Sequence, residues 1–175
     1  MTTATKLLTE VPALMMACCE PDNIRYDLKL PYVDGDYLWA TNGMILARQP
    51  IEDFSPDLLL ECSKDRGKVP KSWPVWEQYG EDGEPFDLPI PEEKACEFCG
   101  GIERVLCEVC LGGRFDFVQD SYEVGPATLA SNMIVKLVSN GVSSVRVVSE
   151  KDPVRFSVGR IEGLLMPMTK PTTDS

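Results

Sequence analysis

The order of secondary-structure signals occurs twice along the chain, and this repetition constrains the fold more than any other feature of the sequence. Residues 4–19 carry apolar side chains at helical spacing, and three short strand-like runs follow before residue 50. A helix followed by three strands returns after residue 115. The chain has 175 residues, the length of one domain, so we predict an α+β domain formed by residues 1–50 and 115–170.

The first half contains a strong hairpin signal. YLWA at 37–40 faces MILA at 44–47 across Asn42-Gly43, a dipeptide typical of tight hairpin turns. Apolar and polar residues alternate over 24–30, which predicts a further strand, and Asp34-Gly35 predicts a turn after it.

Pro12 leaves two interpretations of the first helix. Inside a helix, Pro12 would leave the Leu8 carbonyl without its amide donor. Either the helix begins near Thr9, with Pro12 in its first turn, or it bends at Pro12.

The second helix has clearer signals. Gly125-Pro126 precedes it, Asn140-Gly141 ends it, and one face carries Leu129, Met133, Ile134 and Leu137. Three strand-like runs complete the chain: VSSVRVV, VRFSV and GLLMPM.

Residues 51–91 separate the two halves and are rich in proline, glycine and acidic residues, which predicts an irregular insertion. Its Trp73, Trp76 and Phe86 are expected to pack onto the main body, since a disordered linker seldom carries three large aromatic side chains so close together.

Residues 92–116 contain four cysteines arranged as two Cys-x-x-Cys pairs with glycines after each pair. They are Cys96, Cys99, Cys107 and Cys110. This spacing suits a tetrahedral Zn²⁺ site, and four thiolates would fill the coordination sphere, as in structural zinc. A redox dithiol and plain buried thiols are the alternatives, but neither explains the doubled motif. Cys18, Cys19 and Cys62 lack partners at this spacing and are expected to be core or surface thiols.

The cysteine pattern resembles half of the zinc module of J-protein chaperones, closely in CEVCLGG and less so in CEFCGG. The resemblance implies a bound metal, and we infer no chaperone activity from it.

Charge and composition exclude several functions. The chain has 28 acidic and 17 basic residues, a net charge of -11, which opposes binding to nucleic acid. It has no histidine, and no carboxylates accompany a phosphate-binding loop or an open metal site, so we predict no enzyme and no catalytic residues. Without a membrane-length apolar run or a secretion signal, we expect a cytoplasmic protein.

Two segments resemble the bacterial DNA polymerase sliding clamps (β clamps). Arg25, Tyr26 and Leu28, followed by ATNGMILA at 40–47, match the clamp pattern Arg-Tyr-x-Leu and Ala-Thr-Asp-Gly-His-Arg-Leu-Ala. Met-Pro-Met at 166–168 matches the last clamp strand. The resemblance implies a single clamp-like domain of two helix-plus-strands halves, with residues 51–91 and 92–116 inserted between them.

In clamps these two elements help line a hydrophobic pocket that takes short peptides from polymerases and repair proteins. The resemblance implies a peptide groove here, formed by Thr41, Gly43, Met44, Leu46, Met166, Pro167 and Met168. In a clamp the two elements belong to neighbouring domains. For a chain with a single domain, the resemblance implies that they meet across a head-to-tail contact between subunits. Alternatively, the methionines belong to the core of an ordinary last strand and Asn42-Gly43 is only a turn.

The leading hypothesis is a non-catalytic replication-associated protein, of phage or mobile-element origin, that binds replication proteins or another host protein through this groove. Direct DNA binding would need an oligomer, because the first helix offers only Lys6 and the second only Lys136. The alternative is an acidic decoy that inhibits a host nucleic-acid-binding enzyme, with Glu81-Asp82 and Glu92-Glu93 imitating phosphates.

Overall fold

A computed structural model describes residues 10–20, 22–64, 67–79, 83–95 and 115–168. The described helices are α2 (Ala13–Ala17), the 3-10 helix η1 (Ile51–Asp53), α3 (Pro56–Ser63), α4 (Trp73–Gln78) and α5 (Ser131–Val138). The strands of the first half and the insertion are β1 (Tyr32–Asp34), β2 (Tyr37–Thr41), β3 (Ile45–Pro50), β4 (Glu84–Asp87) and β5 (Glu93–Ala95). Those that follow are β6 (Phe115–Phe117), β7 (Ser121–Val124), β8 (Ala127–Ala130), β9 (Ser144–Val147), β10 (Val154–Val158) and β11 (Ile161–Leu165).

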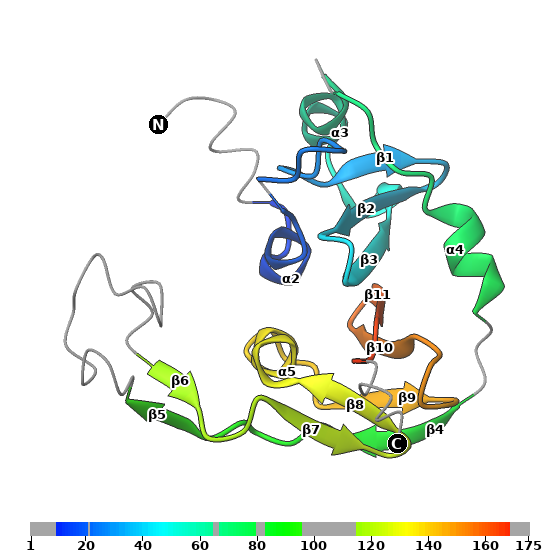
Figure 1. Cartoon of the computed structure of the whole chain (residues 1–175). Coiled ribbons are helices and arrows are strands. Elements are labelled where there is room, and N and C mark those ends of the chain that lie inside the picture. The colour runs from blue at the N-terminus through cyan, green and yellow to red at the C-terminus, as the bar shows by residue number, and fades with distance from the viewer. Residues whose placement is uncertain (1–9, 21, 65–66, 80–82, 96–114, 169–175) are drawn as a thin grey trace.

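One curved sheet joins the two halves of the chain (Figure 1). Its strand order is β1-β2-β3-β11-β10-β9-β4, and all neighbouring strands are antiparallel. The halves meet where β3 pairs with β11, in the register Ala47↔Gly163 and Leu46↔Leu164. Residues more than a hundred positions apart therefore lie side by side at the centre of the sheet.

Both predicted turns of the first half are present. Asp34 pairs with Tyr37 across a turn in which Gly35 has φ 60°. Thr41 pairs with Leu46, and Gly43 in the turn between them has φ 91°, a value that L side chains rarely adopt. Glycine is therefore the residue that these turns need.

The strand predicted over 24–30 is wrong. Instead, the Asn23 Oδ1 atom accepts hydrogen bonds from the amides of Arg25 (3.0 Å) and Tyr26 (2.8 Å), which turns the chain locally. Leu28 forms only an isolated bridge with Glu20. The alternation of apolar residues reflects burial of Leu28 against the body, while Ile24 is fully exposed.

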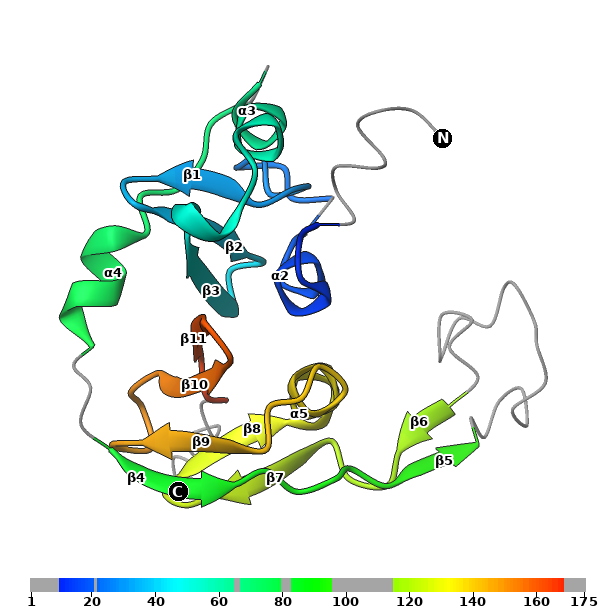
Figure 2. The ribbon, with the colours of Figure 1, turned by 180° about the vertical axis from the view of Figure 1, so that it is seen from behind.

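Helices α2 and α5 contact each other and cover the same face of the sheet (Figures 1 and 2). Pro12 is the N-cap of α2, so this helix begins after the proline and does not bend at it. The α5 helix begins at Ser131, and Leu129 lies on β8 instead, while Ile134 and Leu137 are fully buried. Gly141, with φ 88°, ends the helix as predicted.

The described parts of residues 51–91 contain the 3-10 helix η1, two α-helices and a strand, so the prediction of an irregular insertion is wrong for this segment. The prolines that suggested irregularity occupy tolerated positions. Pro56 and Pro74 lie in the first turns of α3 and α4, where a missing amide breaks no helical bond. Pro85 lies on β4, which is the edge strand beside β9.

The insertion packs onto both faces of the body. The α3 helix buries Leu58 and Cys62 in the main core, and Phe86 of β4 packs partly buried against the same core. The α4 helix lies on the face opposite α2 and α5 (Figure 2), and its Trp76 is buried against Trp39 and Leu164. The expected packing of Trp76 and Phe86 is confirmed, and the side chain of Trp73 is outside the described part.

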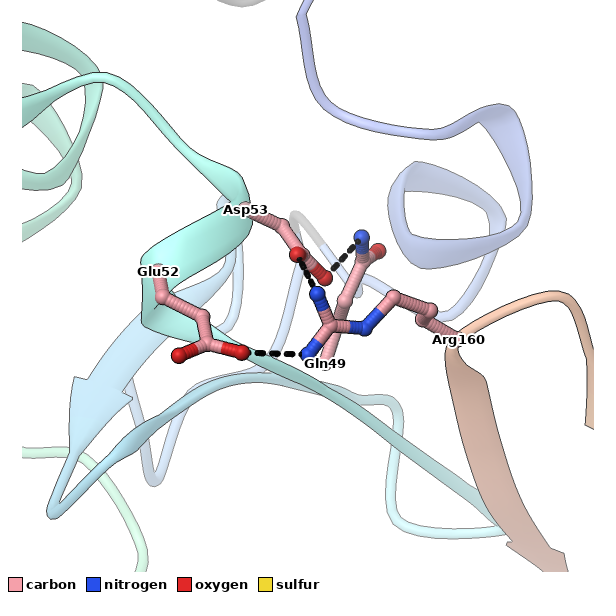
Figure 3. Close-up of polar contacts among 4 residues, drawn as sticks. All are labelled: Gln49, Glu52, Asp53 and Arg160. Atoms are coloured by element: carbon pink, nitrogen blue, oxygen red, sulfur yellow. Dashed lines mark hydrogen bonds and ion pairs between the residues drawn. The ribbon is translucent and has the colours of Figure 1, made fainter.

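A polar contact at the surface links the start of the insertion to the second half (Figure 3). Arg160, in the turn between β10 and β11, binds Glu52 and Asp53 of η1. Gln49 Nε2 donates to the other oxygen of Asp53, at 3.0 Å. The hydrogen bond to Glu52 raises the pKa of the Arg160 guanidinium further above its ordinary value, so the guanidinium remains protonated.

Strands β5 and β6 form a two-stranded arm that projects from the body (Figures 1 and 2). The two strands pair antiparallel, with Ala95 opposite Phe115. The residues that flank the segment 96–114 are therefore neighbours at the end of the arm. All four predicted zinc ligands, Cys96, Cys99, Cys107 and Cys110, lie in that segment, outside the described residues.

Candidate functional site

A groove of about 310 Å³ lies beside the junction of β3 and β11, and α4 contributes to its lining. Five parts of the chain form it: residues 23–28, the β2–β3 turn with its flanking strand residues, residues 70–75, Pro153 just before β10, and the end of β11. Its lining residues are Asn23, Arg25, Tyr26, Leu28, Thr41, Gly43, Met44, Ile45, Leu46, Pro70, Lys71, Ser72, Val75, Pro153, Leu164 and Met166.

Side-chain hydrogen bonds fix the β2–β3 turn at one end of the groove. The Thr41 hydroxyl donates to the Ile45 carbonyl at 2.6 Å and accepts from the Gly43 amide at 3.0 Å. The Asn42 Oδ1 atom accepts from the amides of Met44 and Ile45, at 2.9 and 3.0 Å. A turn held in this way presents Met44 to solvent, and this side chain is 46% exposed.

The segment after β11 forms the adjacent wall. The Met166 amide donates to the Met44 carbonyl at 2.8 Å, which ties this segment directly to the turn. Met166 is 40% exposed and Leu164 is buried beneath it. Pro167 is buried and the Met168 amide donates to the Thr128 carbonyl, at 2.8 Å, so the chain then continues toward β8.

Most residues of the predicted groove lie together in a single chain. Thr41, Gly43, Met44, Leu46 and Met166 all line the cavity, whereas Pro167 and Met168 follow it in sequence and are not lining residues. The implied head-to-tail contact is not needed for the groove to form. Its two elements meet within the chain because β3 pairs with β11.

Sequence reasoning missed the residues that the insertion and residues 23–26 contribute. Val75 and Lys71 close the groove from the α4 side, and Tyr26 closes it from the other. The amide of Asp27 donates to the carbonyl of Lys68 at 2.8 Å, which joins these two segments. Of these residues, Arg25 and Tyr26 belong to the clamp-like segment, so their positions carried a signal that could have identified them.

The charge of the groove differs from that of the whole chain. Among the described residues, its lining includes Arg25 and Lys71 and no carboxylate, in a protein of net charge -11. Arg25 and Lys68 both lie over the Tyr26 ring, 5.3 and 5.4 Å from its centroid. The groove therefore combines an apolar floor with a cationic rim.

The geometry of the groove suits the binding of an apolar partner. Methionine side chains adapt to irregular apolar partners, and the turn supplies fixed walls. The described residues contain no group of three metal-binding side chains. Of the predicted core thiols, Cys18 and Cys62 are buried, and burial raises the pKa of Cys18 to about 12, which keeps this thiol protonated and unreactive.

No family model and no curated protein matches the chain. Its fold is similar to the DNA polymerase sliding clamp from Pseudomonas aeruginosa, in a crystal structure with ligand, with a TM-score of 0.50 and 12% identity. A second crystal structure of that clamp gives a TM-score of 0.45 at 12% identity. Both comparisons cover 97% of this chain and 66% of the clamp chain, so the chain spans just under two thirds of the clamp's length. The first of these comparisons shows a fold similar to that of a sliding clamp.

In the part of the chain that the structure describes, no helix is both long enough and apolar enough to cross a membrane.

Proposed function

We propose that this clamp-like protein takes part in DNA replication by binding a short peptide segment of a partner protein in the groove. One observation carries the proposal. The β2–β3 turn and the segment after β11, which resemble the peptide-binding elements of clamps, line the same apolar cavity next to the Met166–Met44 backbone hydrogen bond.

The shape and chemistry of the groove define the peptide that it would accept. A cavity of about 310 Å³ accommodates one or two large apolar side chains of an extended peptide. Leu164 forms the floor, and Met44 and Met166 are exposed at the walls, where they would lose contact with water on binding. The peptide is therefore expected to anchor through leucine-like or aromatic side chains.

The role we propose is non-catalytic and does not involve encircling DNA as a single chain. In a clamp the helices face the nucleic acid, but α2 carries no basic residue in its last turn and α5 carries only Lys136 there. A net charge of -11 would repel phosphates. Recruitment of a replication protein by its peptide segment fits these charges better.

The test uses a fluorescent peptide that carries the clamp-binding segment of a bacterial replicative polymerase, followed by anisotropy. Met44→Glu and Met166→Glu should each weaken binding by about tenfold or more, because a charge would be buried against the peptide's apolar anchor. Leu60→Glu is the matched control, since Leu60 is 67% exposed on α3, away from the groove. It should bind like the wild type.

Absence of saturable binding to the wild type, or equal weakening in all three variants, would refute the groove proposal. Salt gives a further criterion, because apolar anchoring should persist at ionic strengths that abolish a purely electrostatic contact.

We also propose that Cys96, Cys99, Cys107 and Cys110 hold a structural Zn²⁺ ion at the tip of the β5–β6 arm. Zinc would cross-link the loop through four thiolates and leave no open position for substrate. The pairing of Ala95 with Phe115 is compatible with this role, since it brings together the two residues that flank the cysteine segment.

A further inference from the structure

A second cavity, of about 590 Å³, lies over β9, β10 and β11 on the same face of the sheet as the groove. We call it the arginine cavity, and the polar side chains that line it are Ser144, Arg146, Arg155, Ser157 and Glu162. The alternating burial of β9 and β10 explains this composition. Val145, Val147 and Phe156 face the main core, so the residues between them face outward.

Two like charges lie directly opposite each other in this cavity. Arg146 of β9 is the register partner of Arg155 of β10. Side chains at such positions have Cβ atoms only about 5 Å apart, and like charges there are destabilising. Among the described residues, neither guanidinium has a carboxylate within salt-bridge distance.

The insertion holds both arginines in place without neutralising them. The Arg155 guanidinium lies over the ring of Trp76 from α4, 4.7 Å from its centroid. Arg146 Nη1 donates to the Gly83 carbonyl, just before β4, at 3.0 Å. An aromatic ring and a carbonyl orient a guanidinium but supply no negative charge, so the two positive charges remain available to a ligand.

Glu162, the only carboxylate among the described lining residues, is already bound to an arginine. Its Oε2 atom accepts hydrogen bonds from Arg48 Nε at 3.0 Å and Nη2 at 2.7 Å. The hydroxyls of Ser144 and Ser157 lie on the exposed sides of the same two strands. The cavity therefore offers two guanidiniums and two hydroxyls as hydrogen-bond donors. A carboxylate ligand has only two oxygens and would leave some of these donors unused, whereas the oxygens of a phosphate group can accept from more of them.

We propose that the arginine cavity binds the phosphate group of a small phosphorylated ligand between Arg146 and Arg155. Its volume exceeds that of a phosphate and lies in the range of small-molecule sites, so it has room for the rest of such a molecule. The net charge of -11 disfavours an extended nucleic-acid backbone as the source of the phosphate. This site is separate from the peptide groove and does not depend on it.

Inorganic pyrophosphate is the probe, titrated into ¹⁵N-labelled protein and followed by NMR. Saturable shifts are expected in the amides of 144–147 and 155–157 and in the arginine Nε–H signals. Arg146→Gln should weaken binding by about tenfold or more, as expected for loss of charge-assisted hydrogen bonds. Lys151→Gln, the control, removes the same charge from a side chain that is 82% exposed and should leave the affinity unchanged.

Arg155→Gln also removes the stack on Trp76, so Ser144→Ala provides a second variant that leaves the arginines intact. It should weaken pyrophosphate binding a few-fold, with an unchanged unfolding transition. Met166→Glu should not affect it, which separates this site from the groove. Shifts that do not saturate, or that persist in Arg146→Gln, would overturn the proposal. So would binding of a phosphoserine peptide or a DNA oligonucleotide to Arg146 while pyrophosphate fails to bind.

Discussion

At the scale of single residues, Gly163 is the position where the sheet has no room for a side chain. It lies on β11, opposite Phe156 of β10. A Cβ atom added there would meet the Phe156 ring at 1.9 Å, well inside any tolerated contact. The ring occupies the space above the glycine and is itself only 4% exposed, so it cannot move aside into solvent.

We therefore predict that Gly163→Ala destabilises the protein by about 1–3 kcal/mol, the usual cost of overpacking a core. Chemical denaturation of the wild type and of Gly163→Ala would measure this difference in the free energy of unfolding. In the Phe156→Leu background the smaller side chain leaves room for the new methyl group, so Gly163→Ala should cost clearly less there. Equal costs in the two backgrounds would show that the ring contact is not the cause.

The residues of the groove differ in whether they can be predicted from the sequence. Thr41, Gly43, Met44, Leu46 and Met166 were identified because they stand within two short segments with a recognisable order. Val75 and Lys71 were not, because they reach the groove only through the packing of α4 on the sheet. No local pattern carries that information.

At the scale of elements, the insertion determines one edge of the sheet. The β4 strand covers β9 and becomes the edge strand itself, with Glu84, Pro85 and Asp87 exposed. Proline and acidic side chains are typical of edges protected against further strand pairing. At the other edge, β1 has only three residues and packs beside α3.

We predict that the chain is a monomer in solution, because neither edge offers a long, unprotected strand. Native mass spectrometry should give the mass of one chain, 19.4 kDa, plus any bound metal. Replacing Pro85 and Asp87 together by valine should increase self-association, since β4 then becomes an unprotected edge. A stable six-membered assembly of the wild type would contradict the prediction and favour a ring.

Element boundaries also explain where sequence reasoning failed. The turns with Gly35 and Gly43 were predictable, because a positive φ favours glycine and glycine is visible in the sequence. The helices of the insertion were missed because prolines in their first turns resemble breakers. The strand predicted over 24–30 fails because an Asn23 side chain competes for the backbone amides that a strand would use.

At the scale of the whole molecule, the body and the β5–β6 arm differ in what stabilises them. The body has a core from both halves, centred on residues such as Leu38, Ile45 and Ile134, all at most 1% exposed. The arm has three residue pairs, and Glu93 and Ala95 on one strand are exposed. A two-stranded ribbon of this length is not stable by itself in water. Something beyond its own pairing must hold the arm.

Removal of the proposed zinc should therefore loosen the arm and leave the body folded. With a chelator, hydrogen exchange is expected to speed up in β5 and β6, while amides of β3 and β11 at the centre of the sheet keep their protection. Cys96→Ser combined with Cys99→Ser should speed up exchange in the arm in the same way, and adding the chelator to this variant should have no further effect. Cys62 is buried in the core, so its replacement would act through core packing instead and would not speed up hydrogen exchange in the arm. If the central strands lost protection together with the arm, the metal would support the entire fold. If purified, reduced protein contained no zinc, another interaction would have to stabilise the arm.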